Sequence, residues 1–133
     1  GFGNWFTIQA QEERDHAMLF LEYLQNNGAH VELKTVEAPK KKFKEFKDPL
    51  DESLKHERYV TASIHNIYAA ASKVKDFRTM QFLDWFVKEQ GEEEKTAEDL
   101  IKKLELFGQD GKGLYMLDSE LAARTYSAPT LTL

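Results

Sequence analysis

Cysteine is absent from this sequence, and proline and glycine are scarce, with three and seven copies. Without cysteine the chain can form neither disulfide bonds nor thiolate metal sites, and redox chemistry does not fix its compartment. Low proline and glycine contents leave good helix formers in long uninterrupted stretches. With 133 residues and no composition break, the chain is expected to be a single all-α domain.

Long apolar runs are missing too, since no stretch approaches the roughly 18 residues that a membrane span needs. No basic-plus-apolar signal segment opens the sequence. The net charge of -5 argues against non-specific nucleic-acid binding and suits an interior that attracts cations. We therefore expect a cytoplasmic protein with neither nucleic acid nor a membrane as partner. Gly1 also follows no initiator methionine, so the beginning of the chain is expected to be missing.

Four helices are expected from the helical spacing of apolar residues. Asn4 is expected to cap the first helix, Asp48, which precedes a proline, the second, and Asp76 the third. Residues 1–125 are expected to form the domain, with 126–133 as a C-terminal tail. The helices span about 4–27, 49–75, 77–107 and 118–125.

A crossover over about residues 28–48 joins the first two helices and exceeds the usual length of about 2 to 8 residues. Such a link can run the length of a helix and make the two helices parallel. Its lysine-rich run, residues 40–47, has two interpretations. One is an anion- or nucleic-acid-binding patch; the other, which we favour, is a solvated crossover with Phe43 and Phe46 tucked beneath it.

Each long helix carries a glutamate on its apolar stripe. Glu57 stands at such a position on the second helix, and Glu93 on the third, beside Glu89 and Gln90. On the first helix the glutamate is Glu13, and His16 lies one turn beyond it, over the same face. A buried charge is costly unless it is paired or bound to a metal. Either the first helix is not in a core, or a cation lies beside its glutamate. The stripe of that helix consists of Phe6, Ala10, Glu13, Ala17, Phe20 and Leu24.

These glutamates, one on each of three helices, predict a metal site, with a structural polar core as the alternative. Clustered carboxylates repel one another unless cations offset the repulsion. Carboxylates with one imidazole suit iron or manganese, with zinc as a common surrogate, and helix bundles build di-iron sites in this way. The three-residue spacing of Glu13 and His16 is half of the di-iron pattern, and by itself it is a weak signal of a metal site. His30, His56 and His65 are expected at the surface or beside the site.

Taken together, these motifs resemble those of bacterial non-haem ferritins. The resemblance rests on Gly-Phe-x-Asn-Trp-Phe from Gly1, Gln-Ala-Gln-Glu-Glu-x-x-His from Gln9, His56-Glu57, and Glu-Gln-x-Glu-Glu from Glu89. It implies a ferritin-like helix bundle and an oxidoreductase that oxidises Fe(II) with dioxygen, a ferroxidase. It also implies iron storage as ferric mineral inside a homo-oligomeric shell, a 24-mer in the family.

The same resemblance implies the roles of the site residues. Glu13 resembles the carboxylate that bridges two irons, and His16 the ligand of the first iron. Glu57 and Glu93 resemble ligands of the second iron, with Gln90 nearby. The residues that resemble the third iron site of prokaryotic ferritins are Glu12, Glu89, Glu92 and Glu93.

Two related families match less well. Bacterioferritin has a second E-x-x-H where this chain has Gln90 and Glu93, and its haem-ligating methionine is replaced here by Arg14. No haem is therefore expected. Rubrerythrin-like peroxidases carry a rubredoxin domain whose metal needs cysteines, which this chain lacks.

The resemblance starts at the second helix of the family. The family's first helix supplies a glutamate ligand and a nearby tyrosine, so only Glu13 and His16 are expected for the first iron. Without that helix a long apolar groove would be uncovered, so we expect a detached N-terminal segment or another subunit to supply the fourth bundle helix. The alternatives are a truncated ferritin scaffold that binds metal and assembles with little ferroxidase activity, and a di-iron oxidoreductase acting on organic substrates.

Overall fold

The computed structural model describes residues 1–39 and 42–133, and this part of the chain contains four helices and no strand. The all-α prediction is thus confirmed. No helix in these residues is both long and apolar enough to cross a membrane. The chain divides into two compact units, Lys42–Gln109 and the combination of Gly1–Lys41 with Asp110–Leu133. The helices are α1 (Phe2–Asn26), α2 (Lys47–Lys73), α3 (Phe77–Phe107) and α4 (Gly111–Ala122).

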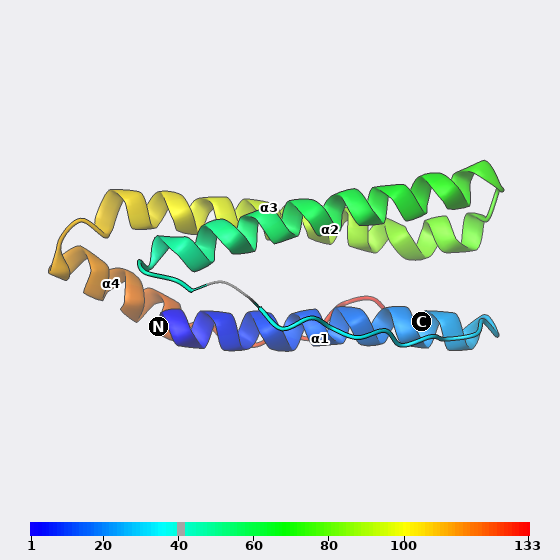
Figure 1. Cartoon of the computed structure of the whole chain (residues 1–133), viewed down its shortest axis with the longest axis horizontal. Helices are drawn as coiled ribbons and strands as arrows, with labels where there is room; N and C mark the ends of the chain where they lie inside the picture. Colours follow the sequence, from blue (N-terminus) through cyan, green and yellow to red (C-terminus); the bar gives the residue numbers. More distant parts are fainter. Residues whose placement is uncertain (40–41) are drawn as a thin grey trace. The chain divides into compact units, whose positions relative to one another are not determined.

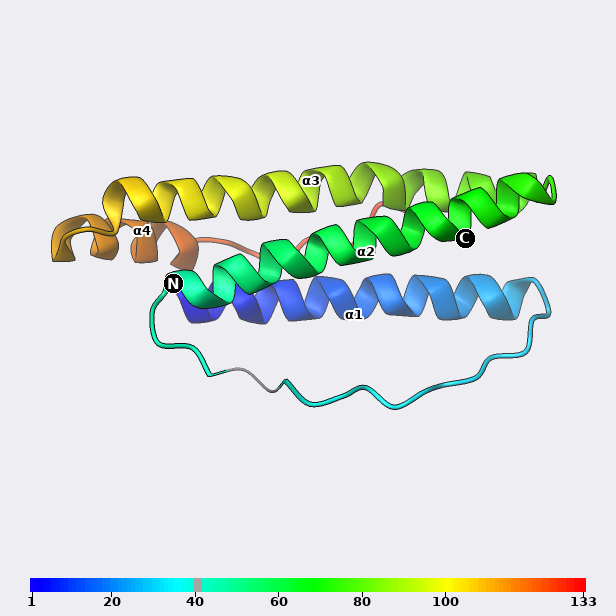
Figure 2. The same ribbon diagram turned by 45° about the horizontal axis from the view of Figure 1, so that its top comes forward.

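The unit Lys42–Gln109 is an antiparallel pair in which α2 and α3 lie side by side (Figures 1 and 2). Three polar contacts occur in opposite order along the two helices and hold their register. Lys47 Nζ lies 2.8 Å from Glu105 Oε1, Arg58 Nη2 donates to Glu98 Oε1 at 3.0 Å, and Tyr68 Oη donates to Asp84 Oδ1 at 2.9 Å.

The facing stripes of this pair agree with the predicted helical period. On α2 the buried residues recur at Leu50, Glu57, Ile64 and Ala71. The buried stripe of α3 begins at Phe82 and ends at Leu104, since Phe107, the last residue of the helix, is exposed. The buried residues of α3 are Phe82, Leu83, Phe86, Gln90, Glu93, Ala97, Leu100 and Leu104.

Asp76 caps α3, as its sequence position predicts. Its Oδ1 accepts the backbone N–H of Thr79 at 3.1 Å, and its Oδ2 accepts the Thr79 hydroxyl at 2.6 Å. These hydrogen bonds, the hydroxyl's first, hold the pKa of Asp76 below its usual value of 3.8. The ionised cap therefore stabilises the folded chain above that usual value, and the contribution is lost as the pH falls through the lowered pKa.

We expect Asp76→Ala to lower the midpoint of thermal unfolding at neutral pH, because the first turn of α3 loses its acceptor. The deficit relative to wild type should shrink as the pH is lowered below 3.8, where the wild-type cap becomes protonated too. Thermal unfolding of both proteins from pH 7 down to acid pH measures this. A deficit that stays constant across the series would contradict it, and Asp76→Asn, which keeps an acceptor oxygen, is the matched control.

The other unit pairs α1 with α4. The amide of Asn4 donates to the backbone oxygens of Leu121 at 3.1 Å, Ala122 at 3.4 Å and Arg124 at 3.0 Å, where α4 ends. The predicted N-cap at Asn4 is therefore wrong. Helix α1 begins at Phe2, and the side chain of Asn4 donates to backbone oxygens at and just after the C-terminal end of α4.

Two other helix starts differ from prediction. Helix α4 begins at Gly111, not near residue 118, because Asp110 accepts the backbone N–H groups of Lys112 and Gly113 at 2.9 and 2.8 Å. Helix α2 begins at Lys47, because the carboxylate of Asp48 reaches back to the amides of residues 44 and 45 and lies inside the first turn.

The buried face of α1 is also not the predicted one. Ala10, Ala17 and Leu24 are exposed, whereas the polar side chains of Gln9 and His16 are buried. The buried residues fall on the face that carries the contacts with α4 and the segment after it. They are Phe2, Trp5, Ile8, Gln9 and His16.

Helix α1 ends at Asn26 as expected, and Gly28 takes the left-handed conformation (φ 66°) that favours glycine. The segment after it has no regular structure and runs back toward the N-terminal end of α1 (Figures 1 and 2). Phe43 and Phe46 are exposed, so the prediction that they are tucked beneath the crossover is wrong. Lys40 and Lys41 of the predicted lysine run lie outside the described residues.

Candidate metal centre

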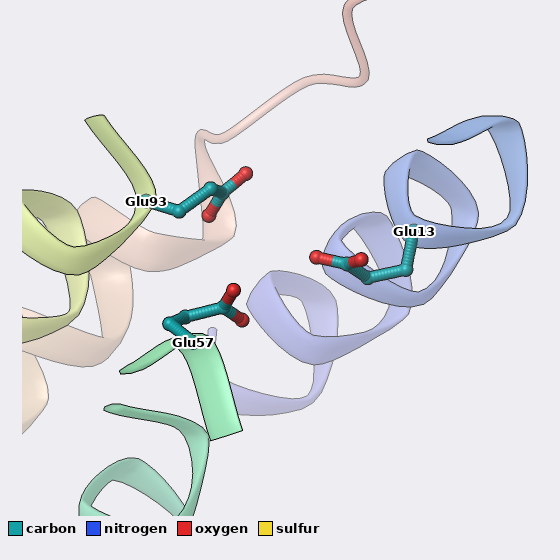
Figure 3. Close-up of side chains that lie close together, drawn as sticks. All are labelled: Glu13, Glu57 and Glu93. Atoms are coloured by element: carbon teal, nitrogen blue, oxygen red, sulfur yellow. The ribbon is translucent and has the colours of Figure 1, made fainter. Parts of the chain in front are cut away.

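Two carboxylates meet inside the α2–α3 pair. Glu57 of α2 is 5% exposed and Glu93 of α3 is 9% exposed, and a carboxylate oxygen of each lies within 4.8 Å of the other (Figure 3). Both occupy stripe positions where the helical period places apolar residues. Two carboxylates this close repel each other at low solvent exposure unless a cation lies between them. Glu57 and Glu93 can therefore hold a metal ion.

Gln90 fixes the orientation of Glu57. Its side chain is 3% exposed, and its Nε2 donates to both the carboxylate Oε2 and the backbone oxygen of Glu57 at 3.2 Å. The same nitrogen lies 3.4 Å from the hydroxyl oxygen of Thr61. Gln90 thus positions one carboxylate of the pair, as residues behind a metal ligand commonly do.

Thr61 extends this network to the edge of the unit. Its hydroxyl donates to Glu94 Oε1 at 2.5 Å, and the other carboxylate oxygen of Glu94 lies 4.0 Å from the guanidinium of Arg58. No role was predicted for Thr61 from the sequence. A threonine one turn beyond a stripe glutamate was the available signal.

Helix α1 carries the glutamate–histidine half of the predicted site. Glu13 Oε2 lies 3.6 Å from Nδ1 of His16, three residues on along the same face. His16 is buried, while the side chain of Glu13 is 40% exposed. Gln9, four residues before Glu13 and also buried, donates its Nε2 to Glu13 Oε1 at 3.4 Å. The side chain of Glu13 is drawn with those of Glu57 and Glu93 in Figure 3.

Glu12 contacts an arginine that was not predicted from the sequence. The guanidinium of Arg124, just after α4, donates to Glu12 Oε2 and to Gln9 Oε1, the latter at 3.0 Å. It also stacks 5.1 Å from the ring centroid of Trp5. Residues 12 and 124 are 112 positions apart, so no local spacing in the sequence could indicate this pair.

The other two glutamates of α3 that were predicted as ligands are less buried than Glu93. Glu89 is partly buried on α3, whereas Glu92 is exposed and its Oε1 lies 3.3 Å from the ammonium of Lys88. The structure thus brings Glu57, Gln90 and Glu93 together in one unit. As predicted, the other histidines lie at the surface: His30, His56 and His65.

Comparison with known proteins gives the same family that the motifs resemble. A family model described as a ferritin-like domain matches residues 1–107. Over 126 residues the chain is 40% identical to the bacterial non-heme ferritins of Staphylococcus haemolyticus (strain JCSC1435) and Staphylococcus aureus (strain USA300). Each match covers 95% of this chain and 76% of the relative.

Solved structures agree. An engineered closed form of the Archaeoglobus fulgidus ferritin has a TM-score of 0.90 and 39% identity, covering 93% of this chain and 76% of that one. An open-pore ferritin from the same archaeon has a TM-score of 0.89 and 39% identity, covering 92% and 75%. The three long helices and one short helix thus match the ferritin helix-bundle fold. The chain belongs to the ferritin family.

Proposed function

We propose that this ferritin oxidises Fe(II) to Fe(III) with dioxygen and stores the ferric product as mineral inside a shell of its own copies. The observation that carries the proposal is the pair of buried carboxylates, Glu57 and Glu93, within 4.8 Å on facing helices. Hard oxygen ligands favour iron. Anionic ligands also stabilise Fe(III) more than Fe(II), because the Coulomb attraction grows with the charge on the ion.

In this proposal the iron is the substrate of a di-iron site. Glu57 and Glu93 bind one iron, with Gln90 holding Glu57 in place. Glu13 bridges to a second iron, which His16 also binds. Each Fe(II) gives one electron to the same dioxygen molecule, which takes up two protons and leaves as hydrogen peroxide.

A third iron site completes the proposal. Glu12, Glu89, Glu92 and Glu93 would bind an iron on its way to the mineral. Since Arg124 contacts the carboxylate of Glu12, an iron there must displace the guanidinium or bind the oxygen that it leaves open. Iron at this site should therefore bind more weakly than at the other two.

The assembly is also part of the proposal. Residues 1–125 form the ferritin-like domain, residues 126–133 are its tail, and copies of the chain assemble with one another. The assembly is a cytoplasmic homo-oligomer, a 24-mer by analogy with the family. Native mass spectrometry tests this part, and a monomer with no companion chain would contradict it.

Mixing the protein with Fe(II) in air-saturated buffer tests the main claim. We expect oxidation, followed by stopped-flow absorbance, to be at least about 100-fold faster than in protein-free buffer, because a single positioned acid or base typically contributes roughly 10²–10⁴-fold. Ferric iron should then co-elute with the protein during gel filtration. Binding of Fe(II) without faster oxidation would contradict the ferroxidase and support the alternative, a scaffold that binds metal and assembles.

A further inference from the structure

Arg124 makes contacts with three residues on one side of α1. Its Nη1 donates to Gln9 Oε1 at 3.0 Å and lies 3.5 Å from the backbone oxygen of Trp5. Its Nη2 donates to Glu12 Oε2, and its guanidinium lies over the ring of Trp5. The planar guanidinium is thereby fixed at both nitrogens and on one face, an arrangement that the point charge of a lysine cannot reproduce.

This contact dictates which way the amide of Gln9 points. A guanidinium only donates hydrogen bonds, so the oxygen of the amide must face Arg124 and its nitrogen must face away. That nitrogen donates to Glu13 Oε1 at 3.4 Å. Gln9 is buried, so few water molecules are available to satisfy its amide in another orientation.

Glu13 is the carboxylate that most needs such support. Its side chain is 40% exposed, and a flexible exposed carboxylate loses rotamer freedom when it binds a metal. The hydrogen bond from Gln9 holds one of its oxygens, while the other lies toward His16. A carboxylate held at one oxygen before metal arrives has less freedom left to lose.

We propose that Arg124 is a positioning residue that acts through Gln9 to set the carboxylate of Glu13 for metal binding. The inference rests on the proposed function, because it takes Glu13 to be a metal ligand. It assigns a role in the metal site to a residue that touches no metal ligand of the di-iron pair and lies 115 positions from Gln9. Residues behind metal ligands typically change metal affinity 10- to 100-fold.

A double-mutant cycle in the full chain tests the inference, with Zn(II) as a redox-inactive probe in titration calorimetry. We expect Arg124→Gln and Gln9→Leu each to weaken the tightest Zn(II) binding event about tenfold. The double variant should be no weaker than either single variant, because both changes break the same relay. Fe(II) oxidation rates of the four proteins should follow the same non-additive pattern.

Two further variants separate positioning from structural support. Gln9→Glu keeps an acceptor for Arg124 but removes the donor to Glu13, so it should weaken Zn(II) binding while the chain stays folded by circular dichroism. Tyr126→Phe is the matched control. Its hydroxyl makes the next contact of the tail with α1, donating to Asp15 Oδ2 at 2.5 Å, and Zn(II) affinity should not change.

The outcomes are distinguishable. Additive losses in the double variant, or an unchanged Zn(II) affinity in Gln9→Glu, would overturn the relay. If Glu13→Ala weakens Zn(II) binding but Arg124→Gln does not, the relay alone is wrong and the proposed function stands. If Glu13→Ala binds Zn(II) as wild type does, the proposed function fails, and the relay fails with it.

Discussion

Glu57→Ala is expected to lower the rate of Fe(II) oxidation at least about 100-fold. The loss of a residue that only orients a metal ligand costs 10- to 100-fold, so removal of a ligand itself should reach at least the upper end of that range. The change also leaves Glu93 without its partner carboxylate and Gln90 without its acceptor on the side chain. Stopped-flow oxidation under air, at saturating Fe(II), measures the effect.

Two companion variants define what the loss means. Glu105→Gln on α3 removes a surface partner of Lys47, with a side chain that is 53% exposed, and should leave the rate unchanged. Glu57→Gln keeps the shape of the side chain but not its charge, so it should be nearly as slow as Glu57→Ala. If Glu57→Ala and Glu13→Ala both oxidise Fe(II) within twofold of wild type, the ferroxidase assignment is wrong.

Leu83→Ala is expected to cause the largest loss of stability. Leu83 on α3 is 0% exposed and is one of the two largest fully buried side chains in the described part of the chain. Truncating a buried leucine loses its transfer free energy and leaves a cavity, which together cost about 2–5 kcal/mol. Since small domains are stable by only about 5–15 kcal/mol, urea unfolding should show a clearly lower midpoint.

Val87→Ala is the matched control, one turn further along α3. Its side chain is 38% exposed, so less apolar surface returns to water, and the cost should stay below about 1 kcal/mol. Equal shifts in the two variants would show that Leu83 does not fill a close-packed site. A change in the slope of the urea transition would instead report a change in the surface exposed on unfolding.

The parts of the molecule that were predictable from sequence depend on local patterns. The helical period identified the stripes of α2 and α3, and with them the buried Glu57 and Glu93, because side chains three and four residues apart share a face. Asp76 was predicted to cap α3 because the capping contact spans only three residues. In each case the interacting groups lie at one end of a single helix, or their burial follows from the period of that helix.

The parts that were mispredicted depend on distant partners. Asparagine is a residue type that favours N-caps, but the amide of Asn4 donates instead to backbone oxygens at the end of α4. The exposed and buried faces of α1 are exchanged at Ala10 and Gln9, because Arg124 supplies a charged partner for the glutamine. Such choices rest on which groups meet in three dimensions, and periodicity carries no information about them.

The pairing of α1 with the end of the chain has a consequence for the order of assembly. Helices α2 and α3 are joined by a short turn, so they close a small loop and can pair soon after both are made. Helix α1 is synthesised earlier, yet its contact at Gln9 must wait for a residue 115 positions later. On the proposed relay, the positioning of Glu13 through Gln9 is completed only after Arg124 has left the ribosome, as one of the last events of folding.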